Sequence, residues 1–392
     1  MVHSFPTERQ AKRKVLLAAV EQIRGTLEAH AEESEVNATL APASVKALHE
    51  SGLLRLKLPA VLGGAEADPV TQMEVIEATT RIHPSAGWCL MIGASSVALP
   101  GAFLPDSALQ QVFGAGAIPG GATSFRPSGR AIVVDGGYLL SGRWAFASGI
   151  PHAQWVNAGA LVVRDGAAPE HYLLTIPTGE VQVHDNWQVL GLRGTGSCDF
   201  SVTDLFVPQE FGWTAMAARP QRGGPLYQLG IPAFVANEHV GFALGVAQQA
   251  LDTILKLARD KRRGFTPSPE LLAEGAEFQR FLGESDLKLQ AVRTLSTAIF
   301  EEAWQTVNRG SVPGPQLQAR TRGVAAWATD VAVEVVTAAF RYAGGSANFR
   351  SSALQGYLRD INAAAQHLLV NSAAYRNQGQ FMLGLPGANP MA

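Results

Sequence analysis

The spacing of apolar residues changes twice along the chain, and this constrains the fold more than any other feature. From Glu8 to His30 apolar residues recur every three or four positions, the period of an amphipathic helix. Near Ile118 the spacing falls to two, which is typical of strands, and from Val235 onward the helical period returns. The chain is therefore expected to form helices, then a β domain, then helices again.

Three domains follow from these changes, in an α+β architecture. We expect an N-terminal helical domain over residues 1–117, a central β-barrel-like domain over 118–220 and a C-terminal four-helix bundle over 221–392. In the centre, two apolar runs flank Asp135-Gly136-Gly137, which predicts a β-hairpin. The periodic stretches of the last domain predict four helices, at 235–259, 276–307, 317–342 and 355–375.

The charge and cysteine content exclude several classes of function. The chain carries 31 basic and 33 acidic residues, so no basic surface for a nucleic acid is expected. Its nine histidines lack the spacing of a metal site. The longest apolar stretch, from Met91 to Leu104, is too short for a bilayer and contains Pro100. Two cysteines and no signal peptide indicate a cytoplasmic protein without a membrane partner.

The low charge also carries information about assembly. Only 16% of the residues are charged, against about 25% in an ordinary soluble protein. Surface that would normally be charged is expected to lie against other subunits. We therefore expect a homo-oligomer.

The segment from Gly142 to Gly149 combines aromatic side chains, a hydroxyl and glycines at the end of a predicted strand. Trp144 and Phe146 can pack against a flat heteroaromatic ring, and Ser148 can reach a ring nitrogen. An ordinary strand end with a buried tryptophan accounts for the same residues. Both interpretations stay open on the sequence alone.

Two further segments lie in the predicted bundle. On a helix, Asp360 and His367 share one face, and the alanines at 363–365 leave space beside the imidazole. Such a group suits proton transfer near neutral pH, although a structural histidine is the alternative. The turn at 343–347 offers backbone N–H groups to a phosphate, and a plain loop between helices explains it equally well.

Together these passages resemble the acyl-CoA dehydrogenase superfamily over nearly the whole chain. The resemblance lies in 142–149, in 192–197 with 204–208, and in 343–367. It implies the helical, β and four-helix domains described above, and a bundle that forms a homotetramer. True dehydrogenases place a catalytic Glu seven or eight residues after an Arg-Asp pair, where this chain has Gln366-His367.

The chain is therefore more similar to the oxygenase branch, the two-component flavin monooxygenases. Two alternatives remain. One is an acyl-CoA dehydrogenase or related flavin oxidase, since some dehydrogenases keep the base on a different helix, although the bundle is expected to lack a carboxylate base. The other is an N- or S-oxygenating flavin monooxygenase.

The resemblance implies a cofactor and partners. Reduced flavin, FADH2 or FMNH2, would come from a separate NAD(P)H:flavin reductase and bind between the β domain and the helices. Oxygen, the co-substrate, would add at C4a to give a hydroperoxyflavin that hydroxylates a small aromatic or heteroaromatic substrate such as a phenol, an indole or a polycycle.

The resemblance also implies roles for individual residues. His367 would position or polarise the substrate, and Ser148 would hold the flavin N5. The substrate pocket would include Trp88, Thr123 and Ser124. The flavin would be bound by Trp144, Phe146, Ala147, Ser148, Gly149, Arg263, Gly344, Gly345 and Ser346.

Overall fold

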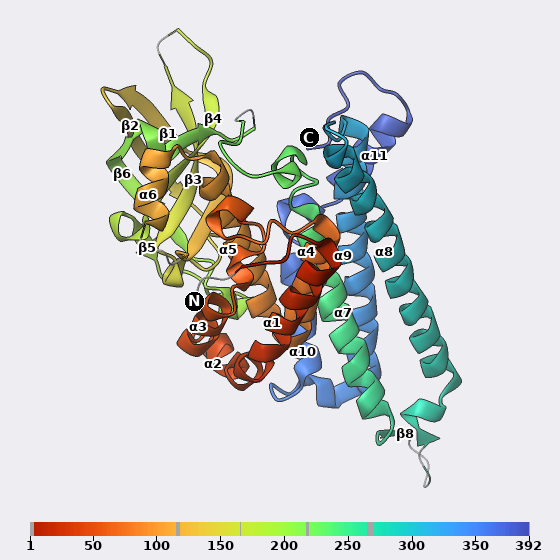
Figure 1. Ribbon diagram of the computed structural model, residues 1–392. Coiled ribbons are helices and arrows are strands. Elements are labelled where there is room, and N and C mark those ends of the chain that lie inside the picture. The colour runs from red at the N-terminus through yellow and green to blue at the C-terminus, as the bar shows by residue number, and fades with distance from the viewer. Residues whose placement is uncertain are drawn as a thin grey trace. The chain divides into compact units, whose positions relative to one another are not determined.

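The computed structural model describes residues 4–114, 118–164, 166–216, 219–264, 268 and 270–391 (Figure 1). The chain divides into two compact units that alternate along the sequence. The first contains the chain up to Asp68, Trp88–Val189 and Arg193–Gln228; the second contains Pro69–Gly87, Leu190–Leu192 and the chain from Leu229 onward. The boundaries expected after 117 and 220 stay predictions, and residues 115–117 lie outside the described chain.

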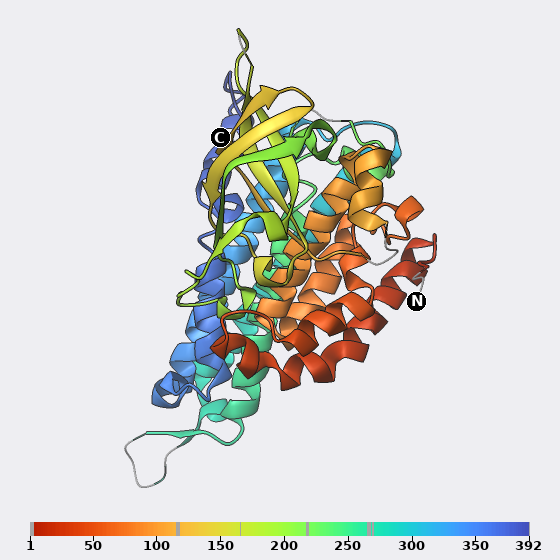
Figure 2. The ribbon, with the colours of Figure 1, turned by 90° about the vertical axis from the view of Figure 1, so that its left-hand side faces the viewer.

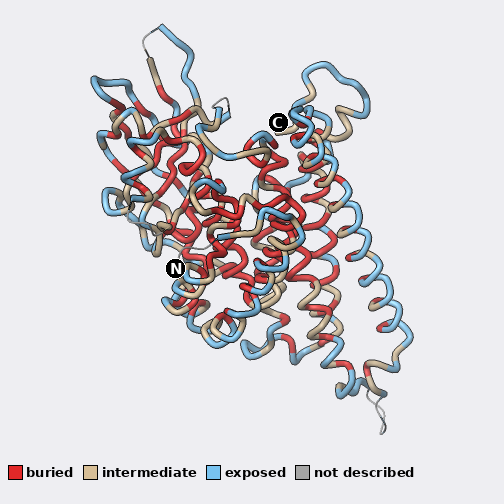
Figure 3. Tube along the Cα trace, viewed as in Figure 1, coloured by how far each residue is buried: buried red, intermediate tan, exposed pale blue. Residues whose placement is uncertain are grey.

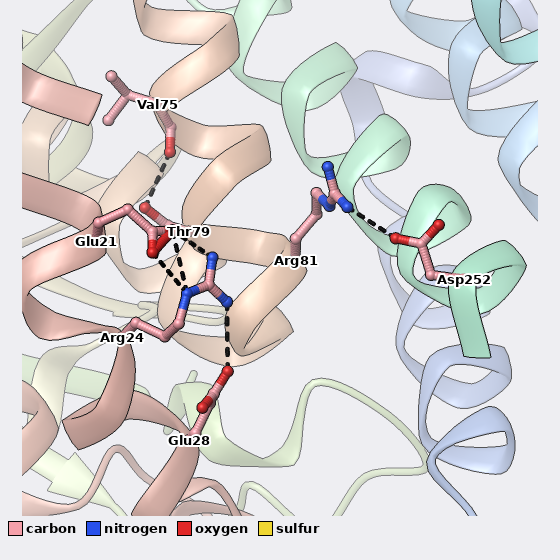
Figure 4. A network of polar contacts seen from close by, with 7 residues as sticks. All are labelled: Glu21, Arg24, Glu28, Val75, Thr79, Arg81 and Asp252. Carbon is pink, nitrogen blue, oxygen red and sulfur yellow. Dashed lines mark hydrogen bonds and ion pairs between the residues drawn. The ribbon is translucent and has the colours of Figure 1, made fainter. Parts of the chain in front are cut away.

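The N-terminal part of the chain is helical, as expected. Its helices include α1 (Arg9–Ala29), α2 (Ala31–Val36), α3 (Pro42–Glu50), α5 (Pro84–Phe103) and α6 (Asp106–Phe113). In α1 one stripe, containing Leu16, Val20, Ile23 and Leu27, is buried, as the spacing predicts. On its exposed side Arg24 pairs with Glu21 and Glu28 (Figure 4).

Helix α5 continues through Pro100, a residue type that usually ends or kinks a helix. A proline has no N–H, so the carbonyl four residues earlier loses its helical partner. That carbonyl belongs to Ser96, and it accepts a hydrogen bond from Asn157 Nδ2 at 2.9 Å. A side chain from the sheet thus satisfies the group that the proline leaves free.

Helix α5 and the segment Pro315–Asn348 are each long and apolar enough to cross a membrane by length and composition. Of their most apolar windows, 78% and 61% are buried within the protein. A helix in the core of a folded protein is buried to this extent, so the apolar composition of both segments is explained by packing within the protein.

The centre of the first unit is a seven-stranded mixed sheet. Its strands are β1 (Gly121–Val134), β2 (Gly137–Trp144), β3 (Trp155–Val163), β4 (Glu170–Pro177), β5 (Gln182–His184), β6 (Asp199–Pro208) and β7 (Gly212–Thr214), in the order β5-β6-β2-β1-β3-β4-β7. Only the β1–β3 pair is parallel among the described pairings. The predicted hairpin is confirmed: Val134 pairs with Gly137 across a two-residue turn in which Gly136 has φ +76°.

Trp144 anchors this sheet from within its core. It is 0% exposed, stacks on Phe200 with ring centroids 4.8 Å apart, and donates its indole N–H to the carbonyl of Gly159 at 2.7 Å. The ring lies so close to the backbone that a Cβ at Gly129 would be 2.3 Å from it, and one at Gly142 2.9 Å. The indole therefore needs glycines on two neighbouring strands.

The second unit is helical. It contains α4 (Pro69–Ile82), α7 (Ala236–Ala258), α8 (Ala276–Asn308), α9 (Pro315–Ala343), α10 (Ala353–Ala364) and α11 (Ala373–Met382). Helices α7, α8 and α9 run side by side in both ribbon views (Figures 1 and 2). Helix α7 approaches α4 closely, because a Cβ at Gly241 would be 2.2 Å from the Met73 carbonyl oxygen.

Ion pairs join the helices of this unit. Arg81 on α4 contacts Asp252 on α7 at 2.7 Å (Figure 4). Arg293 on α8 binds the buried carboxylate of Glu77 through two nitrogens. Much of α8 is exposed, whereas α7 and α9 are mostly buried (Figure 3).

The fourth predicted bundle helix, 355–375, is wrong as one continuous element. Helix α10 ends at Ala364, and a 3₁₀ turn at Leu368–Val370 separates it from α11. The cause is Arg322 on α9, which is 3% exposed. Its guanidinium donates to the carbonyls of Leu368 and Leu369, both at 3.1 Å, and so stabilises the non-helical segment.

Replacing Trp144 with Phe should destabilise the first unit. The Gly159 carbonyl would lose its buried donor, a loss of about 1–3 kcal/mol in the free energy of unfolding, measured by chemical denaturation. Val61→Ala, at a side chain that is 73% exposed, is the control, with an expected change within about 0.5 kcal/mol. Equal stability of Trp144→Phe and wild type would contradict the anchoring role.

Candidate functional site

The segment Phe146–Gly149 follows β2 as a tight turn. Phe146 has φ +62° and Gly149 φ +79°, both left-handed. The N–H of Ala147 donates to Cys198 O at 3.2 Å, and that of Gly149 to Thr195 O at 2.8 Å. The bond from Gly149 joins two passages quoted for the family resemblance, 142–149 and 192–197, and the bond from Ala147 reaches the residue directly after the second passage.

The Ser148 side chain belongs to a buried chain of hydrogen bonds. Trp88 Nε1 donates to Ser148 Oγ at 3.0 Å, and Ser148 Oγ lies 2.8 Å from Ser197 Oγ. Ser197 Oγ in turn lies 2.7 Å from Thr195 Oγ1. All four side chains are buried. The structure therefore brings together Ser148 and Trp88, and adds Ser197, which the sequence analysis did not single out.

The two aromatic residues of this motif differ in environment. Trp144 is enclosed in the sheet core, which argues against contact of its side chain with a flavin. Phe146 is 72% exposed, with its ring edge toward Trp187 at 6.2 Å between centroids. Of the pair, Phe146 is the aromatic side chain that is accessible to a ligand.

Thr123 and Ser124 lie on β1, and both hydroxyls are already engaged. Thr123 Oγ1 donates to Ser96 Oγ at 2.8 Å and accepts from Asn157 Nδ2 at 2.9 Å. Ser124 Oγ donates to the Ala145 carbonyl at 3.2 Å. Because each hydroxyl has one proton, neither retains one for a substrate in this arrangement.

In the second unit, Arg263 and the glycine turn after α9 lie together. Gly344 has φ +64° and ψ −156°, a conformation open essentially to glycine. A Cβ there would lie 3.3 Å from Arg263 Nη2, whose guanidinium donates to the carbonyls of Arg341 and Tyr342. Lys261 Nζ donates to Ser346 Oγ at 2.8 Å. Gly345 and Ser346 are exposed beside these two cations.

This arrangement fits a flavin phosphate. Two cationic side chains flank an exposed turn with a backbone conformation that only glycine adopts easily, and phosphates are bound by such combinations of N–H groups and cations. The buried Ser148 hydroxyl, with an exposed aromatic ring two residues away, fits the ring system. Each of these two groups of residues, taken by itself, has the chemistry to contact one part of a flavin.

His367 follows α10 instead of lying on it, which corrects the helical placement expected from the sequence. Its Nδ1 accepts the N–H of Leu369 at 3.3 Å, so that the imidazole caps the 3₁₀ turn. The ring lies 4.5 Å from that of His239 on α7, tilted by 38°. Burial lowers the pKa of His367 to about 4, so the side chain is neutral at physiological pH.

Arg359 and Asp360 hold the segment Leu190–Leu192. The Asp360 carboxylate accepts the N–H of Leu192 at 2.7 Å, and Arg359 Nη1 donates to Leu190 O at 2.7 Å. Leu192 has φ +55°, an unusual value for a non-glycine residue. The Arg-Asp pair therefore stabilises a strained loop.

Sequence reasoning missed two buried ionisable residues on α7, Glu238 and His239. Glu238 is 1% exposed, and the expectation that the bundle lacks a catalytic carboxylate base stays a prediction. The sequence gives little indication that these two residues are buried, since a single Glu-His pair on a helix is as common on an exposed face. Within the described ranges no cluster of three His, Cys, Asp or Glu side chains suits a metal ion.

The lowered pKa of His367 predicts a dependence of stability on pH. A histidine that is neutral in the folded state but has an ordinary pKa near 6.5 when unfolded favours unfolding as the pH falls from about 6.5 toward 4. His367→Gln removes this contribution. Its melting temperature should therefore fall less than that of wild type between about pH 7 and pH 5; an equal fall would show that His367 is solvated.

Comparisons with known proteins agree with this architecture. Residues 7–103 match the acyl-CoA dehydrogenase N-terminal domain family, and residues 238–372 match the acyl-CoA dehydrogenase C-terminal domain family. The flavin-dependent monooxygenase oxygenase subunit HsaA of Rhodococcus jostii is 30% identical over 93% of this chain and 97% of its own. Indole-3-acetate monooxygenase of Pseudomonas putida is 28% identical over 88% of each protein.

A solved structure is similarly close. XiaF from a Streptomyces species, in complex with FADH2 and glycerol, superposes with a TM-score of 0.88 at 25% identity, covering 97% of this chain and 98% of XiaF. The resemblance inferred from the sequence is therefore confirmed. The chain belongs to the acyl-CoA dehydrogenase superfamily, among relatives that are oxygenase subunits of flavin-dependent monooxygenases.

Proposed function

We propose that the protein is the oxygenase component of a two-component flavin monooxygenase that hydroxylates an aromatic or heteroaromatic compound. The observation that carries the proposal is the similarity over nearly the full length to oxygenase subunits, including HsaA and indole-3-acetate monooxygenase. The flavin is FAD or FMN in its reduced form, supplied by a separate NAD(P)H:flavin reductase. When bound, reduced flavin supplies the electrons that activate O2.

The chain's own residues would bind and orient the cofactor. Ser148 would contact the flavin N5 from its buried turn, and Phe146 would cover part of the ring system. Arg263 and the turn Gly344–Ser346 would bind phosphate. His367, as a neutral imidazole whose Nδ1 accepts a backbone N–H, carries its proton on Nε2 and would donate it as a hydrogen bond to the substrate. Apolar surroundings would exclude water.

Assembly and location are part of the same proposal. Helix α8 exposes Leu287 by 66% and Leu295 by 45%, and apolar side chains on an exposed helix face support contact with other subunits. We propose a homotetramer in the cytoplasm. Light scattering tests the assembly: a monomer at micromolar concentration would contradict it.

The function is tested with purified protein, a flavin reductase, NADH and a panel of phenols, indoles, polycyclic aromatics, amines and sulfur heterocycles under 18O2. The expected product is one aromatic compound that gains a single labelled oxygen atom, detected by mass spectrometry. The control omits the oxygenase but keeps the reductase. If no aromatic, amine or sulfur compound gains oxygen while reduced flavin is consumed, the monooxygenase assignment fails.

Ser148→Ala should uncouple the reaction. Without the hydroxyl at N5, more reduced flavin would be oxidised without product. The ratio of hydrogen peroxide to hydroxylated product should rise about tenfold, the factor that corresponds to a lost buried hydrogen bond of about 1.5 kcal/mol. Peroxide and product are quantified in the same samples. Ser141→Ala, at a serine of β2 that binds Asp204, is the matched control, and unchanged coupling in Ser148→Ala would remove Ser148 from the site.

A second candidate function, an acyl-CoA dehydrogenase, is favoured by one observation. Glu238 is a buried carboxylate beside His239, whose ring contacts that of His367. Removal of a proton α to a thioester requires such a base. Anaerobic mixing of the FAD-loaded protein with acyl-CoA thioesters decides between the two: bleaching of the oxidised flavin that Glu238→Gln abolishes would support the dehydrogenase.

A further inference from the structure

The hydrogen-bond chain at Ser148 contains three hydroxyl groups in succession. Ser148 Oγ lies 2.8 Å from Ser197 Oγ, and Ser197 Oγ lies 2.7 Å from Thr195 Oγ1. Ser148 is 6% exposed, Ser197 3% and Thr195 0%. Either oxygen of each pair can be the donor, so the geometry permits two directions of hydrogen bonding along the same atoms.

The partners of Ser148 restrict what its hydroxyl can do. A serine hydroxyl has one proton and two acceptor lone pairs. An indole N–H only donates, so Trp88, at 3.0 Å, always occupies one lone pair. One lone pair and one proton remain, and they are divided between Ser197 and whatever ligand lies at Ser148.

The flavin N5 needs a hydrogen-bond acceptor when the flavin is reduced and a hydrogen-bond donor when the flavin is oxidised. In reduced flavin N5 carries a hydrogen and donates it, whereas in oxidised flavin N5 has a lone pair and accepts. Against reduced flavin, Ser148 must give its own proton to Ser197. Against oxidised flavin, it gives that proton to N5 and accepts one from Ser197 instead.

We propose that Ser148, Ser197 and Thr195 form a reversible hydroxyl relay in which Ser197 is the positioning residue that adapts Ser148 to the redox state of the flavin. The inference rests on the proposed placement of Ser148 at N5. Trp88 then acts as a fixed donor that holds Ser148 equally in both redox states, a different role from the substrate contact that the family resemblance implies for it.

Removing Ser197 affects the two redox states unequally. With reduced flavin bound, the Ser148 proton is left without its acceptor inside the protein, and a buried unsatisfied donor is costly. With oxidised flavin bound, Ser148 merely keeps an unused lone pair, which proteins tolerate more readily. Loss of Ser197 therefore weakens the binding of reduced flavin more than that of oxidised flavin.

The experiment compares the dissociation constants of oxidised and reduced flavin, using FAD and FMN in anaerobic titrations. In Ser197→Ala the ratio of the oxidised to the reduced constant should fall about tenfold relative to wild type. Thr195→Val, which deletes the far hydroxyl but keeps Ser197, should shift the ratio in the same direction by less. Trp88→Phe should weaken both redox states by a similar factor and leave the ratio unchanged.

The double variant Ser148→Ala/Ser197→Ala separates the relay from a change in packing. If Ser197 acts through Ser148, adding Ser197→Ala to Ser148→Ala leaves the ratio unchanged. An unaltered ratio in Ser197→Ala, or the same shift with and without Ser148, overturns the relay alone. A wild-type protein that binds neither FAD nor FMN in either state overturns the proposed function and the relay together.

Discussion

The packing of Trp144 against glycine backbone is the interaction on which the β domain and its candidate site depend. The indole occupies space that side chains at Gly129 and Gly142 would fill, and its N–H binds the Gly159 carbonyl of β3. Strands β1, β2 and β3 are thereby fixed against one another. Because Ser148 follows only four residues after Trp144, the position of the turn at 146–149 depends on this anchor.

Much of this architecture follows from local sequence. Hydrophobic periods located the long helices and most strands, and Asp135-Gly136 located the hairpin, because these signals arise between neighbouring residues. Gly52, with φ +76° after α3, was likewise predictable as a helix terminator. The resemblance to the superfamily rested on such local motifs, and the comparisons confirm it.

What the sequence did not predict depends on partners distant in the chain. The continuation of α5 through Pro100 requires Asn157, and the end of α10 before His367 requires Arg322. Neither partner can be found by periodicity. The same reason explains why Ser197 and His239 escaped notice: each acquires its significance from a neighbour that lies 49 or 128 positions away along the chain.

Arg322 connects the segment around Pro390 to the loop that follows His367. The guanidinium that binds the loop after His367 also donates to the Pro390 carbonyl at 3.0 Å, and Asn377 Nδ2 donates to the same oxygen at 3.3 Å. The guanidinium uses a different nitrogen for each acceptor, so one side chain binds Pro390 and the loop after His367 at the same time. Replacement of the Pro390 segment would therefore remove an acceptor from the same guanidinium that binds the loop after His367, so a change at residue 390 reaches the surroundings of an imidazole 23 positions earlier in the sequence.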